Sequence, residues 1–235
     1  MRPASKPVNV SLRSRIPYLL VAALLGCALS LHAEEKTPEP PTCQQTAVEE
    51  VERRHRKVKD LRVRFVQTTR SSVPDSPANR SSGHAILALP NRMRWTYESP
   101  EESLLVSDGK TLWLFDPGFR EVQRLPVGDD GFLGAAAAQF LLGRSNLVAE
   151  FQVRTLSCDS QGAVLELLPR KPASYQRLTL ATSRPGGDIA WTEVVDLLGN
   201  TTRLDFSEPR FDTGPEASLF VFDPPPGASV IDLVP

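Results

Sequence analysis

Apolar and polar side chains alternate with a period of two over long stretches of the chain. Residues 61–66 read LRVRFV and residues 92–97 read RMRWTY, so an apolar side chain follows each arginine in both segments. Such alternation places apolar side chains on one face of a strand and polar side chains on the other. The pattern therefore predicts an antiparallel sheet with one buried face and one face in contact with water.

Turn signals extend this pattern through most of the chain. Asp108-Gly109 lies between two apolar runs and supplies the residues that a tight hairpin turn demands. We expect further short strands near residues 84–89, 121–125, 151–156, 163–168, 175–182, 189–196, 201–206 and 219–222. A sheet of that many strands must curl, close or split into two.

Two segments depart from the period of two and predict helices. Residues 44–58 carry apolar side chains at helical spacing among many charges, which indicates an amphipathic helix. Residues 129–143 are almost entirely apolar, with aspartates that can cap the start and Gly143 that can end the helix. A helix with so few polar residues must pack against another apolar surface. We therefore expect a mainly β fold, in which a curled antiparallel sheet is covered at its open mouth by short helices.

The N-terminal segment predicts export. Residues 1–33 have a basic start, an apolar run from Ile16 to Leu31 and a small residue, Ala33, before two acids. These are the features of a cleaved signal peptide, and the run is shorter than the roughly 20 apolar residues of a membrane-spanning anchor. Residues 24–27, LLGC, resemble a lipobox, so lipid anchoring at Cys27 is an alternative.

We expect residues 34–43 to form a disordered leader, since prolines and charges there leave nothing to bury, and residues 44–235 to form one domain. The four charges of the signal segment are all basic, so the mature chain is more acidic than the net charge of −1 of the whole sequence. Mild acidity argues against nucleic acid as a partner.

Two cysteines remain after cleavage, Cys43 and Cys158. An oxidising compartment permits a disulfide between them. Two unpaired thiols are the alternative, because Cys43 lies next to the predicted leader.

The sequence lacks the motifs of common catalytic and metal sites. Its histidines are His32, His55 and His84, and the first is lost with the signal peptide. No zinc, calcium, phosphate-loop or serine-hydrolase motif is present, so we predict no metal, no cofactor and no catalytic residues. Asp129-Asp130 is interpreted as a helix cap rather than a carboxylate pair.

Several strings resemble one known family when they are taken in order. They are GHAILALPNRMRWTY at 83–97, SLLVSDGKTLW at 103–113, FLLGR at 140–144 and FVFDPPPGA at 220–228, with VKDL at 58–61 and FVQT at 65–68 at the start. Together these strings closely resemble the outer-membrane lipoprotein carrier (LolA) family, over about residues 44–232.

The resemblance implies an unclosed half-barrel, with helices forming a lid over an apolar cavity. It also implies a periplasmic carrier that takes acylated lipoproteins from an inner-membrane ATP-driven exporter and delivers them to an outer-membrane acceptor. We expect such a carrier to act as a monomer.

If the resemblance holds, the strands form the cavity wall and the apolar helix predicted at residues 129–143 forms the lid. Candidate lipid-binding residues of the wall are Val63, Phe65, Ile86, Met93, Trp95, Leu104, Val106, Leu112 and Leu114. Candidate residues of the lid are Phe132, Leu133, Phe140 and Leu141. Ordinary core packing is the alternative for each strand residue.

One position departs from the family pattern. Family members commonly carry a basic residue just before the Pro-Asn pair, where it helps to hold the lid shut, whereas this sequence has Leu89. The lid must then be held in another way. Two further functions stay open at this stage: a binder or sensor of another lipid on the same fold, and an enzyme built on this scaffold.

Overall fold

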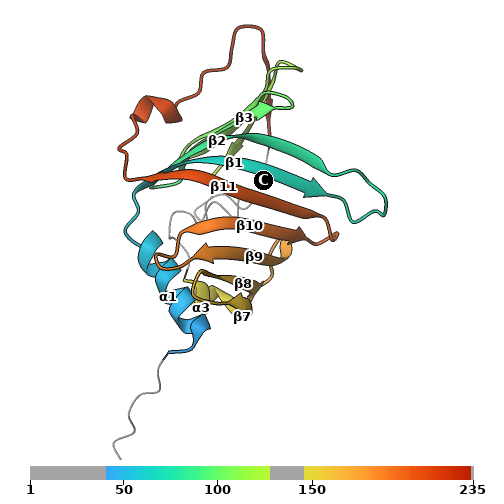
Figure 1. Ribbon diagram of the computed structural model, residues 1–235. Coiled ribbons are helices and arrows are strands. Elements are labelled where there is room, and N and C mark those ends of the chain that lie inside the picture. Colours follow the sequence, from blue (N-terminus) through green and yellow to red (C-terminus); the bar gives the residue numbers. More distant parts are fainter. Residues whose placement is uncertain (1–40, 128–145, 234–235) are drawn as a thin grey trace, which may run out of the picture. The chain divides into compact units, whose positions relative to one another are not determined.

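The computed structural model describes residues 41–127 and 146–233, and within them twelve strands form one sheet (Figure 1). The strand order is β12-β6-β5-β4-β3-β2-β1-β11-β10-β9-β8-β7. All neighbouring strands are antiparallel except β12 and β6, which are parallel. The strands are β1 (Asp60–Arg70), β2 (Asn79–Ala88), β3 (Arg92–Ser99), β4 (Ser103–Asp108), β5 (Thr111–Asp116), β6 (Glu121–Pro126), β7 (Phe151–Cys158), β8 (Gly162–Pro169), β9 (Tyr175–Ser183), β10 (Ile189–Asp196), β11 (Thr201–Phe211) and β12 (Ser229–Asp232).

The two outermost strands, β12 and β7, do not pair with each other, so the sheet is not closed. This confirms the expected mainly β, unclosed half-barrel. One predicted strand, at residues 219–222, is wrong. Its first two residues end a short 3₁₀ helix, η2 (Ala217–Phe220), its last two lie in no helix or strand, and the last strand begins later, at Ser229. Pro224, Pro225 and Pro226 between the two cannot donate to a ladder.

The hairpin between β4 and β5 forms where Asp108-Gly109 predicts it. Asp108 accepts hydrogen bonds at Oδ1 from the backbone N–H groups of Lys110 (2.7 Å) and Thr111 (2.8 Å). Gly109 has a φ of +99°, which favours glycine over any residue with a Cβ. Local turn chemistry therefore fixes the register of β4 against β5.

Both faces of the sheet are covered in part. On one face, called the inner face, helix α1 (Cys43–His55) packs its buried Ala47, Val48 and Val51 into the same apolar cluster as the strands, close to β7 and β8. The short helix α3 (Leu147–Glu150) lies beside the start of β7, as Figure 1 shows. The opposite face is called the outer face.

The outer face of β2 to β5 is covered by the C-terminal segment. Phe220 of η2 is buried against Ile86 and Ala88, and Arg94 donates a hydrogen bond to the carbonyl oxygen of Leu219 at 3.3 Å. Further along, the ring of Phe222 lies 5.7 Å from that of Phe115. Strands β2, β4 and β5 therefore carry apolar side chains on both sides, because both sides are covered.

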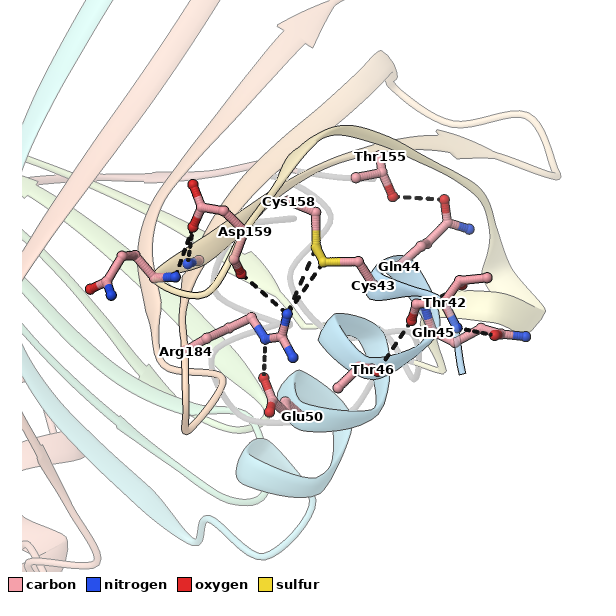
Figure 2. Close-up of a disulfide and its surroundings, with 12 residues drawn as sticks. Thr42, Cys43, Gln44, Gln45, Thr46, Glu50, Thr155, Cys158, Asp159 and Arg184 are labelled. Carbon is pink, nitrogen blue, oxygen red and sulfur yellow. Dashed lines mark hydrogen bonds and ion pairs between the residues drawn. A yellow bond between two sulfur atoms is a disulfide. The ribbon is translucent and has the colours of Figure 1, made fainter. Parts of the chain in front are cut away.

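Helix α1 is held to the sheet at its N-terminus by a disulfide. Cys43 and Cys158, which are 115 positions apart in sequence, are bonded (Figure 2). The pairing that the sequence left open is therefore present, and α1 begins at Cys43, one residue before the predicted start of the domain. Thr42 caps the helix and forms a capping box with Gln45.

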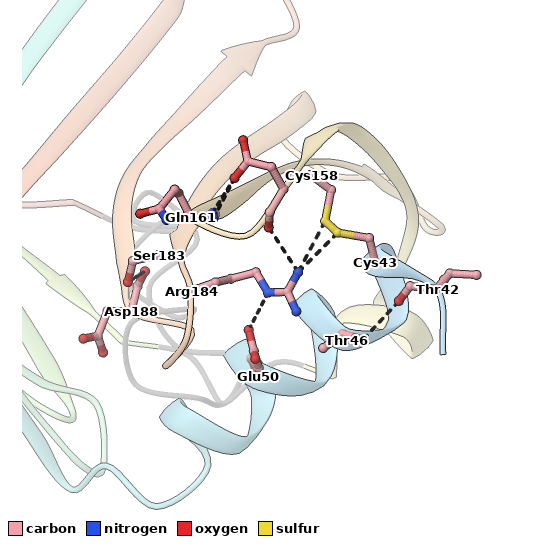
Figure 3. A network of polar contacts seen from close by, with 11 residues as sticks. Thr42, Cys43, Thr46, Glu50, Cys158, Gln161, Ser183, Arg184 and Asp188 are labelled. Atoms are coloured by element: carbon pink, nitrogen blue, oxygen red, sulfur yellow. Dashed lines mark hydrogen bonds and ion pairs between the residues drawn. A yellow bond between two sulfur atoms is a disulfide. The ribbon is translucent and has the colours of Figure 1, made fainter. Parts of the chain in front are cut away.

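A polar network beside the disulfide also ties α1 to the turn between β9 and β10. Figure 3 shows Arg184 at its centre, with Nε donating to Glu50 of α1 at 3.1 Å and Nη1 donating to the carbonyl oxygen of Asp159 at 3.2 Å. The Arg184 and Glu50 side chains are mostly buried, so this ion pair is less screened than a surface pair. Gly187 lets the turn approach closely, because a Cβ there would meet the Glu50 backbone at 2.5 Å.

We expect the Cys43→Ser, Cys158→Ser double variant to lose about 2–4 kcal/mol of unfolding free energy, since a long closed loop in the unfolded chain gains entropy when it opens. Urea unfolding followed by circular dichroism measures this loss. Wild-type protein in excess reductant is the control, and it should show the same loss. Equal stability of the double variant and the oxidised wild type would contradict the role assigned to the disulfide.

Candidate functional site

The inner face carries a continuous row of apolar side chains across five strands. Strand pairing places in one row Val63 of β1, Ala85 of β2, Trp95 of β3, Leu105 of β4 and Leu114 of β5. Residues directly opposite one another on paired strands point to the same face. Neighbouring rows add, among others, Phe65, Met93 and Leu112, and all of these residues belong to or pack against the main apolar cluster.

An aromatic group lies within this face. The rings of Phe65 and Trp95 are 4.5 Å apart, and the rings of Phe65 and Tyr97 meet edge to face at 5.2 Å. The Tyr97 hydroxyl donates to Oε1 of Gln67 at 2.8 Å, and burial raises the pKa of Tyr97 above its ordinary value. Tyr97 therefore stays neutral, and the face presents apolar and uncharged groups at this point.

Six of the nine predicted wall residues lie on the inner face: Val63, Phe65, Met93, Trp95, Leu112 and Leu114. Whether they contact lipid stays a prediction. The other three are wrong for this face. Ile86, Val106 and Leu104 point to the outer face, because Ile86 pairs with Arg94, Arg94 with Val106, and Leu104 with Thr96.

The wrong face was predicted for these three residues for a simple physical reason. Strands β2 and β4 carry consecutive apolar residues, so their sequence does not say which set faces inward. Register shows that the inward residues are Leu87 and Leu105, which sequence reasoning did not select. Strand pairing identifies them: Leu105 lies directly opposite Trp95, and Leu87 lies opposite Met93, which is two residues from Trp95 and on the same face.

Coverage of the inner face is uneven. Near β7 and β8 it is covered by α1, and Leu165, Leu167, Leu178 and Leu180 there are fully buried. Toward β3 to β6 several members are only half-buried: Tyr97, Leu105, Leu114 and Leu125. Apolar side chains are therefore more accessible on this half of the inner face than near β7 and β8.

The four predicted lid residues, Phe132, Leu133, Phe140 and Leu141, lie outside the described residues. Leu89, at the position of the family's basic residue, is half-buried and packs against the inner-face cluster. Its carbonyl oxygen accepts a hydrogen bond from Nη2 of Arg92 at 2.9 Å. Leu89 thus contributes apolar contact where a basic residue would contribute hydrogen bonds.

Titratable groups of the described residues do not converge on the inner face. His84 lies on the outer side, where Nδ1 is 2.8 Å from Oε1 of Glu98, and this hydrogen bond lowers the pKa of Glu98. His55 is buried on α1, with its ring 6.1 Å from that of Phe211. In residues 41–127 and 146–233, no group of three or more His, Cys, Asp or Glu side chains could hold a metal ion.

A cleft of about 430 Å³ lies between the end of α1 and the β9–β10 turn. Its lining residues are Arg53, Arg54, Lys57, Val58, Gly186, Asp188 and Asp212. Charged walls do not suit an acyl chain, because charged groups lose hydration when apolar matter covers them. The inner face therefore remains the candidate site. No helix in the described part of the chain is long and apolar enough to cross a membrane.

Comparison with known proteins matches this chain to one family. A family model described as "Outer membrane lipoprotein carrier protein LolA" matches residues 56–223. The outer-membrane lipoprotein carrier protein of Methylibium petroleiphilum is 40% identical over 176 residues, which are 74% of this chain and 83% of the relative. Its counterpart in Cupriavidus pinatubonensis is 30% identical over 194 residues, 81% and 90% of the two chains.

A solved structure of an uncharacterized conserved protein from Thermus thermophilus has the same fold. It superposes with a TM-score of 0.51 at 13% identity and covers 82% of this chain and 100% of that one. The likeness at this identity concerns the fold alone. Taken with the family model and the relatives, the matches show that the chain belongs to the outer membrane lipoprotein carrier protein LolA family.

Proposed function

We propose that this chain is a periplasmic carrier that holds the acyl chains of lipoproteins against its inner face and moves them from the inner to the outer membrane. The observation that carries the proposal is the continuous apolar row on the inner face, whose members on β4 and β5, Leu105 and Leu114, are only half-buried. Family membership supports the same role, since both relatives described above are named outer-membrane lipoprotein carrier proteins.

The physics of acyl-chain burial explains why a carrier needs partners. Removing acyl chains from water is worth roughly 0.8 kcal/mol per CH₂. Three long chains would total on the order of 30 kcal/mol, which exceeds the ceiling of noncovalent affinity near 20 kcal/mol. The cargo, however, starts in a membrane where its chains are already in apolar surroundings. Transfer to the protein then gains little, so an inner-membrane ATP-driven exporter must supply the energy, and an outer-membrane acceptor can remove a weakly held cargo.

We infer that the chain reaches the periplasm by means of residues 1–33 and matures by their removal. The disulfide supports an oxidising compartment, because such bonds form and persist there. We also propose that the protein performs no chemistry on its cargo: the two described histidines lie on separate parts of the molecule, His55 on α1 beside Phe211 and His84 on the outer face beside Glu98.

Leu104 and Leu105 offer a matched test of the site. Both are half-buried leucines on β4, and they point to opposite faces. We expect Leu105→Glu to weaken binding of a fluorescent acyl-chain probe by at least tenfold, since an acyl chain would strip water from the carboxylate. Leu104→Glu is the control and should bind within about twofold of wild type. Equal loss in both variants would remove the inner face as the site.

Depletion of the protein in cells tests the cargo. We expect acylated lipoproteins to accumulate in the inner membrane, because no soluble carrier then shields their chains during transfer. Membrane fractionation followed by immunoblotting measures the distribution. Normal sorting of lipoproteins after depletion would exclude the carrier role and favour a binder or sensor of another lipid.

The lid is tested by Phe140→Glu. We expect this variant to lose lipid uptake while keeping its circular dichroism spectrum, because the change would place a charge among the apolar side chains of residues 129–143. Mass measurement of lipid in the purified variant checks the loss. A variant that purifies with as much lipid as wild type would show that Phe140 is not part of the lid.

A further inference from the structure

The turn between β10 and β11 presents two leucines to solvent. Leu197 is 62% exposed and Leu198 is 79% exposed, although tight turns ordinarily carry polar residues or glycine at such positions. Val73, in the loop between β1 and β2, is also 62% exposed. Exposed apolar residues that gather at one place indicate contact with another apolar phase.

The polar residues of this turn form hydrogen bonds within the turn itself. Asp196 accepts at Oδ1 from the backbone N–H groups of Leu198 (2.8 Å) and Asn200 (2.9 Å), and at Oδ2 from the Asn200 side-chain amide (2.7 Å). These bonds, led by the one from the Asn200 side chain, lower the pKa of Asp196. The polar groups of Asp196 and Asn200 therefore have partners within the turn, and its two leucines are the side chains that face outward.

The β1–β2 loop is fastened to the same turn. The backbone N–H of Ser72 donates to Oδ1 of Asn200 at 3.0 Å, and a Cβ at Gly199 would lie 3.3 Å from the Ser72 Cβ. Val73 follows Ser72 directly, so it lies next to the turn. Val73, Leu197 and Leu198 together are called the apolar tip.

Cations flank the apolar tip on both sides. The strand order β1-β11-β10-β9 places Arg70, which pairs with Thr201, on one side and Arg177, which pairs with Val195, on the other. Both arginines are exposed, and neither has an ion pair with any residue in 41–127 or 146–233. Nearby carboxylates are Asp75 on the loop, Glu193 two residues before Val195 on β10, and Asp196, which is already hydrogen-bonded within the turn.

We propose that the apolar tip docks the protein on an anionic lipid bilayer, with Val73, Leu197 and Leu198 entering the headgroup boundary and Arg70 and Arg177 contacting the phosphates. Apolar side chains beside unpaired cations are the combination that binds anionic membrane surfaces. A small convex tip fits this occupant better than a protein partner, since stable protein interfaces bury about 1,200 Å² or more. The inference concerns the outside of the molecule and does not depend on the identity of the cargo.

Co-sedimentation with vesicles tests the proposal. The purified protein is mixed with vesicles of roughly 30% phosphatidylglycerol in phosphatidylethanolamine, and with vesicles of phosphatidylcholine alone. We expect binding to the anionic vesicles to exceed binding to the neutral ones by about tenfold and to fall as salt is added.

Three variants separate the contributions. Leu197→Asn with Leu198→Asn should lower binding to anionic vesicles about tenfold, and Arg70→Gln with Arg177→Gln should lower it by a similar factor and weaken its salt dependence. Val221→Asn is the matched control: Val221 is 59% exposed, lies on the C-terminal segment away from the turn, and should leave binding unchanged. Wild-type protein that stays in the supernatant, or a leucine variant that binds like wild type, would overturn the proposal.

Discussion

The register of the sheet decides the role of nearly every apolar residue in this protein. A step of one residue along a strand moves a side chain from the inner to the outer face. Leu105 thus faces the candidate site, while its neighbour Val106 is completely buried on the side of the C-terminal segment. Strand pairing determines which side chains form the inner face. It also leaves apolar side chains on both faces, which α1 covers on the inner side and η2 covers on the outer side.

Period-two alternation was sufficient to predict a mainly β fold with a single curled sheet, and it placed Val63, Phe65 and Trp95 correctly on the inner face. It failed in β2 and β4, where Ile86, Leu104 and Val106 are flanked by other apolar residues and only pairing with Arg94 and Thr96 reveals their direction. The strand predicted at 219–222 failed because Phe220 packs as a buried anchor, a long-range contact that local propensity does not contain. The disulfide likewise joins residues 115 apart in sequence.

An open apolar face is a liability in an ordinary soluble protein, because it invites aggregation. Here it is the basis of function, since a carrier must accept apolar chains and release them again. The same logic explains why α1 is fastened so firmly: the disulfide, the Arg184–Glu50 ion pair and the close approach at Gly187 hold one half of the inner face closed. The half from β3 to β6 is where we propose that cargo binds, and Leu89 packs against the same apolar cluster.

In the proposed function, acylated lipoproteins occupy the inner face. Mass spectrometry of the protein purified from the periplasm, without detergent, tests this most directly. We expect lipoproteins bearing their acyl chains to copurify with the wild-type protein. Recovery of free phospholipid alone, or of a protein with no bound lipid or lipoprotein, would contradict it.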